Sequence, residues 1–174
     1  MKTKLIISSL FVSSVLMSAA HAADGQIKFT GKITATACKI DSNSTDQTVN
    51  MGTISSSTFT NAGSTSSPTR FSIKLTDCPK EYKTAQVKFD GQTDKGNRDY
   101  LALSGAENSA KGVAIALYED NSNDIIPITQ SSREQALTAQ KINELKFVAK
   151  YIATASQVSP GAGDAVANFT ITYN

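Results

Sequence analysis

Residues 25–33 read GQIKFTGKI, and apolar or small residues alternate with polar ones along the whole stretch. Ile27, Phe29 and Ile33 share one face with the glycines, whereas glutamine, lysine and threonine lie on the other. A period of two predicts a half-buried β-strand. Segments near a chain terminus are usually loose unless something holds them. What this strand pairs with is therefore the question on which the function depends.

The residues that precede this strand have the layout of a secretory signal. Lys2 and Lys4 give a positive start, residues 5–17 are apolar apart from serines, and Ala20-His21-Ala22 fits a small-x-small cleavage site. The apolar run is too short and too interrupted by serine to span a membrane. We therefore predict that residues 1–22 are removed on export. No other stretch approaches twenty apolar residues, so no membrane span is expected in the mature chain.

Charge and composition exclude several classes of function. Removal of Lys2 and Lys4 leaves 15 Lys+Arg (17 minus 2) against 15 Asp+Glu, which is a formal net charge of zero. A neutral chain gives no electrostatic case for binding nucleic acid or an anionic membrane. The only histidine, His21, lies in the signal, so the mature chain lacks the commonest general base. We expect no enzyme activity, no cofactor and no metal.

Two cysteines, Cys38 and Cys78, remain in the exported chain, and an oxidising compartment predicts a disulfide between them. A bacterial periplasm would suit this chemistry. The alternatives are a pair of free thiols or a metal site, but two cysteines without histidine cannot complete a tetrahedral zinc shell.

Short alternating runs recur along the rest of the chain. Turn-rich stretches separate them, and the best helix signal is a turn at 131–135, where a serine is followed three positions later by glutamate. This pattern favours a single β-sandwich domain. The predicted strands are residues 33–40, 70–76, 85–89, 113–119, 145–153 and 165–173.

The ordered set of motifs resembles the structural subunits of chaperone–usher fimbriae, close to the type 1 fimbrial major subunits. The signal, the donor-like strand, the cysteine spacing and the penultimate Tyr173 carry the resemblance. It covers nearly the whole mature chain. The other matching stretches are 46–49, Met51-Gly52, 71–78, 113–115, Pro160-Gly161-Ala162 and 165–173.

The resemblance implies an all-β, incomplete immunoglobulin-like β-sandwich that lacks its final strand and is completed by a donor strand from another chain. It implies a signal at 1–22, a donor-strand extension at 23–33 and a pilin domain at 34–174. It further implies a structural subunit of a bacterial surface fimbria involved in adhesion. The expected partners are identical or related fimbrial subunits, a periplasmic chaperone and an outer-membrane usher.

The same resemblance assigns residues to the two halves of assembly. The donor strand would use Ile27, Phe29, Gly31 and Ile33. The chaperone or acceptor-groove edge would use Gly161, Phe169, Ile171 and Tyr173. The sequence agrees on one point, because no residues follow Asn174 that could cover a groove beside the run at 165–173.

Two other functions compete with this interpretation. A tip adhesin or a small secreted carbohydrate-binding sandwich belongs to the binding class, but tip adhesins carry an additional receptor-binding domain, for which this chain has no room. A self-contained secreted sandwich of enzyme or inhibitor type is disfavoured by the missing histidine and the missing last strand. The alternative to a donor strand is that residues 25–33 form an ordinary first strand in a sheet of their own domain.

Overall fold

The computed structural model describes residues 25–33 and 36–174. The chain divides into two units, one ending at Ile33 and the other beginning at Thr34. The predicted signal at 1–22 lies outside the described residues, and so do residues 23–24 of the predicted donor extension. The division into signal, donor extension and pilin domain stays a prediction.

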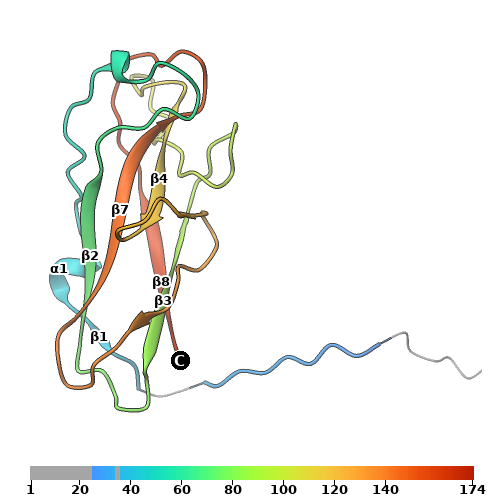
Figure 1. Cartoon of the computed structure of the whole chain (residues 1–174), viewed down its shortest axis with the longest axis vertical. Coiled ribbons are helices and arrows are strands. Elements are labelled where there is room, and N and C mark those ends of the chain that lie inside the picture. The colour runs from blue at the N-terminus through green and yellow to red at the C-terminus, as the bar shows by residue number, and fades with distance from the viewer. Residues whose placement is uncertain (1–24, 34–35) are drawn as a thin grey trace, which may run out of the picture. The chain divides into compact units, whose positions relative to one another are not determined.

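The second unit is built from two antiparallel sheets (Figure 1). The larger sheet has the strand order β1-β2-β7-β4-β5, and the smaller has the order β6-β3-β8. The first sheet contains β1 (Lys39–Ile40), β2 (Thr69–Thr76), β7 (Asn143–Ala153), β4 (Val113–Glu119) and β5 (Ile125–Ile126). The second contains β6 (Gln135–Ala136), β3 (Thr84–Gly91) and β8 (Ala167–Tyr173).

Aromatic side chains join the two sheets. Phe71 on β2 and Phe147 on β7 lie on neighbouring strands with ring centroids 5.6 Å apart. Phe89 on β3 meets Phe147 edge-on at 5.1 Å and Phe71 at 6.0 Å. Such edge-to-face pairs stabilise a core beyond the area that they bury. Phe147 and Phe89 are buried, whereas Phe71 is only half-buried.

The larger sheet also carries a small cluster on its outer face. All seven residues of β4 are buried, and the inward period of two is therefore lost there. Tyr118 and Val148 belong to this outer-face cluster, and Tyr100 packs against it. Both faces of β7 are therefore buried near its C-terminal end, with Phe147 on the inner face and Ile152 on the outer face. The cluster consists of Ala114, Ala116, Tyr118, Val148 and Ile152.

Two predictions of local structure are wrong. Among the described residues of the predicted strand 33–40, only Lys39–Ile40 pairs as β1, opposite Thr76 and Leu75, because β2 ends at Thr76. The predicted helical turn at 131–135 is extended instead, since Ser131 bridges to Lys88 of β3. Two short helices lie where turns were expected, α1 (Ser42–Thr45) and η1 (Ser56–Thr58).

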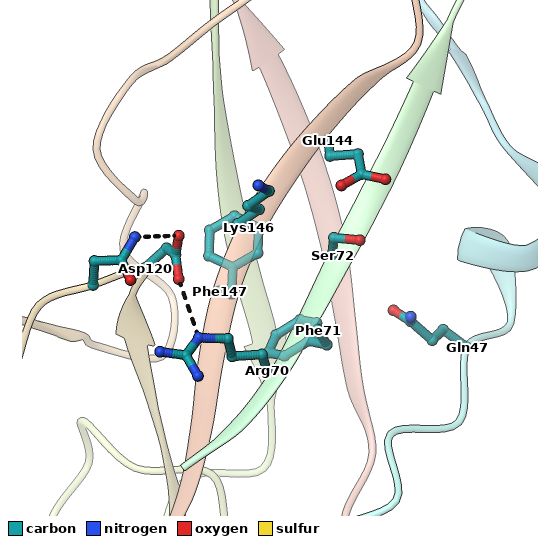
Figure 2. A pocket seen from close by; sticks show the side chains of 9 residues that line it. Gln47, Arg70, Phe71, Ser72, Asp120, Glu144, Lys146 and Phe147 are labelled. Atoms are coloured by element: carbon teal, nitrogen blue, oxygen red, sulfur yellow. Dashed lines mark hydrogen bonds and ion pairs between the residues drawn. The ribbon is translucent and has the colours of Figure 1, made fainter.

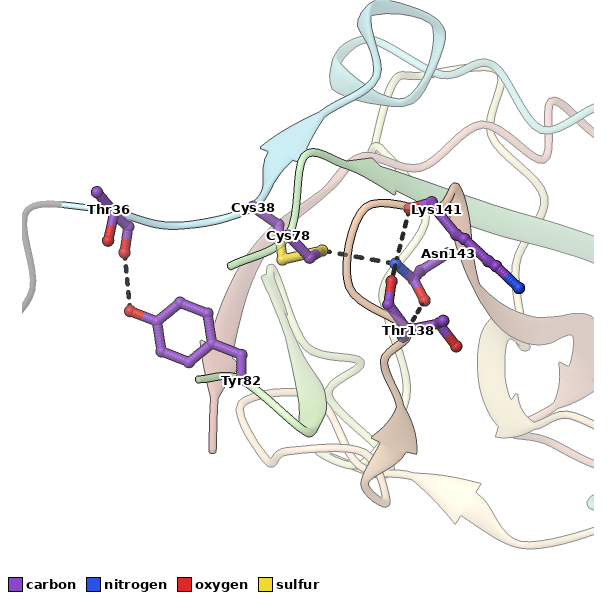
Figure 3. The surroundings of a disulfide bond; sticks show 7 residues. All are labelled: Thr36, Cys38, Cys78, Tyr82, Thr138, Lys141 and Asn143. Atoms are coloured by element: carbon purple, nitrogen blue, oxygen red, sulfur yellow. Dashed lines mark hydrogen bonds between the residues drawn. A yellow bond between two sulfur atoms is a disulfide. The ribbon is translucent and has the colours of Figure 1, made fainter. Parts of the chain in front are cut away.

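The disulfide between Cys38 and Cys78 is present, as predicted. Both cysteines are buried, and the Asn143 side chain donates to the Cys78 sulfur at 3.6 Å while it also binds two backbone carbonyls (Figure 3). The bridge closes a loop with a sequence separation of 40. In the chain-entropy account a loop of this length stabilises the fold by about 4 kcal/mol.

Candidate strand-acceptor site

The strand β8 lies at the edge of the smaller sheet. It pairs with β3 along its whole length, from Ala167 opposite Gly91 to Tyr173 opposite Ala85. Among the described residues, no strand pairs with its other edge. We call this side of β8 the open edge. Unpaired backbone N–H and C=O groups on such an edge can hydrogen-bond to a further strand.

The inner face of β8 is less buried than the strand beside it. Residues directly opposite in a ladder point to the same side of the sheet, so each pair faces the same core. The β3 members are buried with at most 4% of their surface exposed, whereas the β8 members are only half-buried. The difference arises on the open edge, where no further strand of the described chain covers the β8 side chains. The pairs are Phe89 with Phe169, Val87 with Ile171, and Ala85 with Tyr173.

A second stretch with incomplete burial comes from the segment 46–54, which we call the flanking segment. Met51 and Ile54 are half-buried and pack against the same core as the inner face of β8. Within the part of the chain that the structure describes, no backbone hydrogen bond joins residues 47–54 to β8 or to another strand. The flanking segment therefore contributes apolar side chains to the core without completing the smaller sheet.

Contacts at both ends of β8 show how the chain passes it. At the C-terminal end, the Tyr82 ring stacks on Tyr173 with centroids 5.1 Å apart. The Tyr82 hydroxyl donates to the Thr36 carbonyl at 2.8 Å (Figure 3). At the other end, Ile54 lines a pocket together with Gly161, six residues before β8 begins. The chain from Thr36 to Ile54 thus passes from the end of β8 to its beginning, opposite to the direction of β8 itself.

The pocket at the beginning of β8, which we call the edge pocket, has a volume of about 360 Å³. Tyr151 lines it and donates its hydroxyl to the Gly163 carbonyl at 2.9 Å. Burial raises the pKa of Tyr151, and the nearby Asp164 carboxylate raises it further. The phenol is therefore neutral at ordinary pH and acts as a hydrogen-bond donor. The apolar part of the lining comes from Ile54, Phe59, Ala110, Val113, Val158 and Pro160.

Gly161 allows two backbones to approach closely at the wall of this pocket. A Cβ at this position would lie 2.4 Å from the Ala110 nitrogen and 2.5 Å from the Asn108 carbonyl oxygen. Ala162, the next residue, accepts from Ala110 N–H at 2.9 Å and donates to the Asn108 carbonyl at 2.8 Å. The lack of a side chain at Gly161 thus permits the pairing that builds the pocket wall.

Replacement of Gly161 with alanine is expected to destabilise the domain. Backbone atoms cannot move aside as the end of a side chain can, and forced overpacking costs about 1–3 kcal/mol. Urea unfolding of the purified subunit–chaperone complex measures the effect. Ser159→Ala in the same turn is the matched control, because its exposed side chain can be removed while its two backbone bonds to Lys111 stay. Equal unfolding midpoints for both variants would contradict the expectation.

The predicted donor residues are exposed within the single chain. Ile27, Phe29 and Ile33 expose 82%, 92% and 101% of their surface, and a Cβ at Gly31 would meet nothing within 4 Å. The segment 25–33 forms no strand with any described residue. A row of exposed apolar side chains on one face is unfavourable in water unless a partner covers it.

A larger and more open hollow, of about 630 Å³, lies over β2 and β7 (Figure 2). Arg70 and Asp120 form an ion pair there, with 3.8 Å between the guanidinium nitrogen and the carboxylate oxygen. Glu144 and Lys146 bring the formal charge of the lining to zero. Among residues 25–33 and 36–174, no group of three or more His, Cys, Asp or Glu side chains could hold a metal. The lining suggests no catalytic set.

Sequence reasoning had singled out Gly161, Phe169, Ile171 and Tyr173, and the structure places all four along β8 or at the edge pocket. The sequence alone did not indicate a role for Tyr82 or Tyr151. Neither residue belongs to a recognisable motif, since their partners lie 46 residues earlier and 12 residues later in the chain.

Comparison with known proteins agrees with this geometry. The family described as fimbrial protein matches residues 27–174. The chain is 36% identical to the fimbrial subunit type 1 of Salmonella typhimurium, over 99% of this chain and 100% of that one. It is 38% identical to the type-1 fimbrial protein A chain of Salmonella typhi, with the same coverage.

Solved structures support the same assignment. The P pilus rod subunit PapA is 27% identical, with a TM-score of 0.66 over 80% of this chain and 100% of that one. A Burkholderia pseudomallei antigen and type I fimbria protein is 38% identical, with a TM-score of 0.61 over 86% and 97% of the two chains. The fold is accordingly an immunoglobulin-like sandwich that lacks a strand. The chain belongs to the fimbrial protein family.

Proposed function

We propose that this chain is a structural subunit that polymerises into a bacterial surface fimbria. Each copy receives a strand at the open edge of β8 and donates its own residues 25–33 to the next copy. One observation carries the proposal. A single chain has both a half-buried strand face beside an unpaired edge and an exposed apolar alternation that nothing in the described chain covers. Addition of a strand to a sheet edge satisfies both.

The expected gain is large enough to hold a polymer together. Full burial of Ile27, Phe29 and Ile33 is worth about 1.5–3 kcal/mol each, so about 5–9 kcal/mol before ordering costs. Each backbone bond to the open edge contributes about 1 kcal/mol net. Gly31 lies between two of these side chains, and its lack of a Cβ lets the strand approach the core closely.

Chain connectivity favours one direction of insertion. Ile33 precedes Thr36 by three positions, so the inserted strand ends within about 11 Å of the start of its own domain. Thr36 lies near the C-terminal end of β8, because Tyr82 binds its carbonyl and stacks on Tyr173. If the donor strand ran parallel to β8, its Ile33 would lie at the C-terminal end of β8. The acceptor's own donor segment leaves from that same end, so the starts of the two domains would meet there. An antiparallel insertion avoids this crowding, places Ile33 near the edge pocket and propagates head to tail.

The exposed edge also predicts assisted assembly. An open strand edge beside apolar side chains promotes aggregation, so a monomer needs a temporary cover. As the family resemblance implies, a periplasmic chaperone would fill the groove, and the donor strand of the next subunit would replace it at an outer-membrane usher. The subunit has no catalytic role in this scheme. Within residues 25–33 and 36–174, no helix is long and apolar enough for a membrane crossing.

Expression with and without a cognate chaperone and usher tests the function. We expect soluble subunit only with the chaperone, and surface fibres in electron micrographs only when the usher is also present. Fibres should carry the subunit as their repeating component in immunogold labelling. Stable, monomeric, protease-resistant subunit in the absence of the chaperone would contradict the proposal, because it would show that the sandwich is complete without a second chain.

A further inference from the structure

Tyr82 contacts both regions that the proposed assembly uses. Its hydroxyl donates to the Thr36 carbonyl at 2.8 Å (Figure 3). Its ring stacks on Tyr173 at 5.1 Å between centroids, with 29° between the planes. Only 8% of Tyr82 is exposed, although it lies in the turn before β3. Burial raises the pKa of Tyr173, as does the neighbouring Tyr82. One side chain therefore joins the start of the domain to the last residue of the acceptor strand.

Residues 38–40 carry further restraints on the start of the domain. We call residues 36–40 the root, because the predicted donor segment ends three residues before it begins. The disulfide holds Cys38, and the two-residue strand β1 pairs Lys39 and Ile40 with β2. These contacts fix the root from Cys38 onward. The Tyr82 hydroxyl acts two residues earlier, at the Thr36 carbonyl.

In the proposed polymer, on which this inference rests, each domain lies between two inserted strands. One is its own donor segment, which leaves from the root, and the other is received beside β8. The geometry between root and β8 within one domain therefore sets the angle between consecutive strands of the fibre. We propose that Tyr82 is the positioning residue that fixes this angle, and thereby the bending stiffness of the fimbria.

Two variants separate the hydrogen bond of Tyr82 from its ring stack. Tyr82→Phe removes the hydrogen bond to Thr36 but keeps the stack on Tyr173. Tyr82→Leu removes both. Tyr118→Phe is the matched control, because it also deletes a phenol hydroxyl from a buried tyrosine, in the outer-face cluster where the ring contacts Lys150 at 4.3 Å. Each variant is made in the full chain and assembled with its own chaperone and usher.

Two measurements on purified fibres report the effect. Hydrogen exchange at residues 37–40 should become roughly fivefold to tenfold faster in Tyr82→Phe, as expected for the loss of one hydrogen bond. Electron micrographs should show a shorter persistence length with unchanged fibre yield, and a larger loss of stiffness in Tyr82→Leu. Tyr118→Phe fibres should match the unmodified fibres in both measurements.

Unchanged exchange and stiffness in Tyr82→Phe fibres would overturn the inference. So would failure of Tyr82→Phe subunits to accumulate with the chaperone, since that would show a role in folding instead of in positioning. Failure of the proposed function gives a different result. In that case the unmodified chain would form no fibres, or Phe29→Asp would assemble normally, whatever Tyr82 does.

Discussion

Phe29→Asp is expected to abolish fibre formation while the subunit still accumulates with its chaperone. Phe29 exposes 92% of its surface in the single chain, so the aspartate costs the monomer little. In the fibre the same position would be buried in another subunit's core, where an unpaired carboxylate costs several kcal/mol in addition to the lost apolar burial. The measurement has two parts, namely the yield of the chaperone complex and the amount of polymer.

Lys28→Asp is the matched control, because it introduces the same side chain one residue away on the polar face of the alternation. A one-residue step changes the face of a strand, so this variant should polymerise. Two outcomes would show that residues 25–33 are not the donor strand. Either Phe29→Asp removes the chaperone-bound monomer as well, or it leaves the fibres unaffected.

Ile171→Asp is expected to remove the chaperone complex as well as the fibres, whereas Phe29→Asp should remove only the fibres. Ile171 lies on the inner face of β8 opposite Val87, which is fully buried. Removing an isoleucine from a core typically costs about 2–5 kcal/mol, and desolvation of the carboxylate adds to this. Domains are stable by only about 5–15 kcal/mol, so most of the folded subunit should be lost.

Thr172→Asp provides the comparison, since this side chain lies next in the same strand and is exposed. It should leave the chaperone-bound yield near normal. Quantitative immunoblots of periplasmic extracts, with and without the chaperone, measure both variants. Normal yield of soluble Ile171→Asp complex would show that the inner face of β8 does not form the acceptor core.

Period-two alternation predicted most of the sheet from sequence. The strand expected at 113–119 has the same bounds as β4, and the run expected at 70–76 became β2 with one more residue. Alternation also separated the apolar face of 25–33 from its polar face. Two cysteines in an exported chain predicted the disulfide that the structure contains. The strands could be predicted because alternation is a property of neighbouring residues. The disulfide could be predicted because exported chains fold in an oxidising compartment.

Local signals failed where a distant partner decided the conformation. The serine and glutamate of 131–135 fit a helix cap, yet Ser132 donates its N–H to the Val87 carbonyl and its hydroxyl accepts from Val87 N–H at 2.9 Å. Pairing with β3 satisfies those backbone groups better than one isolated helical turn, whose formation is unfavourable in short segments.

The sequence by itself determined the all-β class, the disulfide and the faces of its alternating strands, because side-chain periodicity follows from the geometry of a single strand. Only the tertiary structure revealed that β8 has one edge unpaired among the described residues, that a Cβ at Gly161 would lie 2.4 Å from the Ala110 nitrogen, and that Tyr82 joins Thr36 to Tyr173. These features depend on which distant segments meet. A local pattern states which face a residue occupies, and packing across the sandwich decides what lies against it.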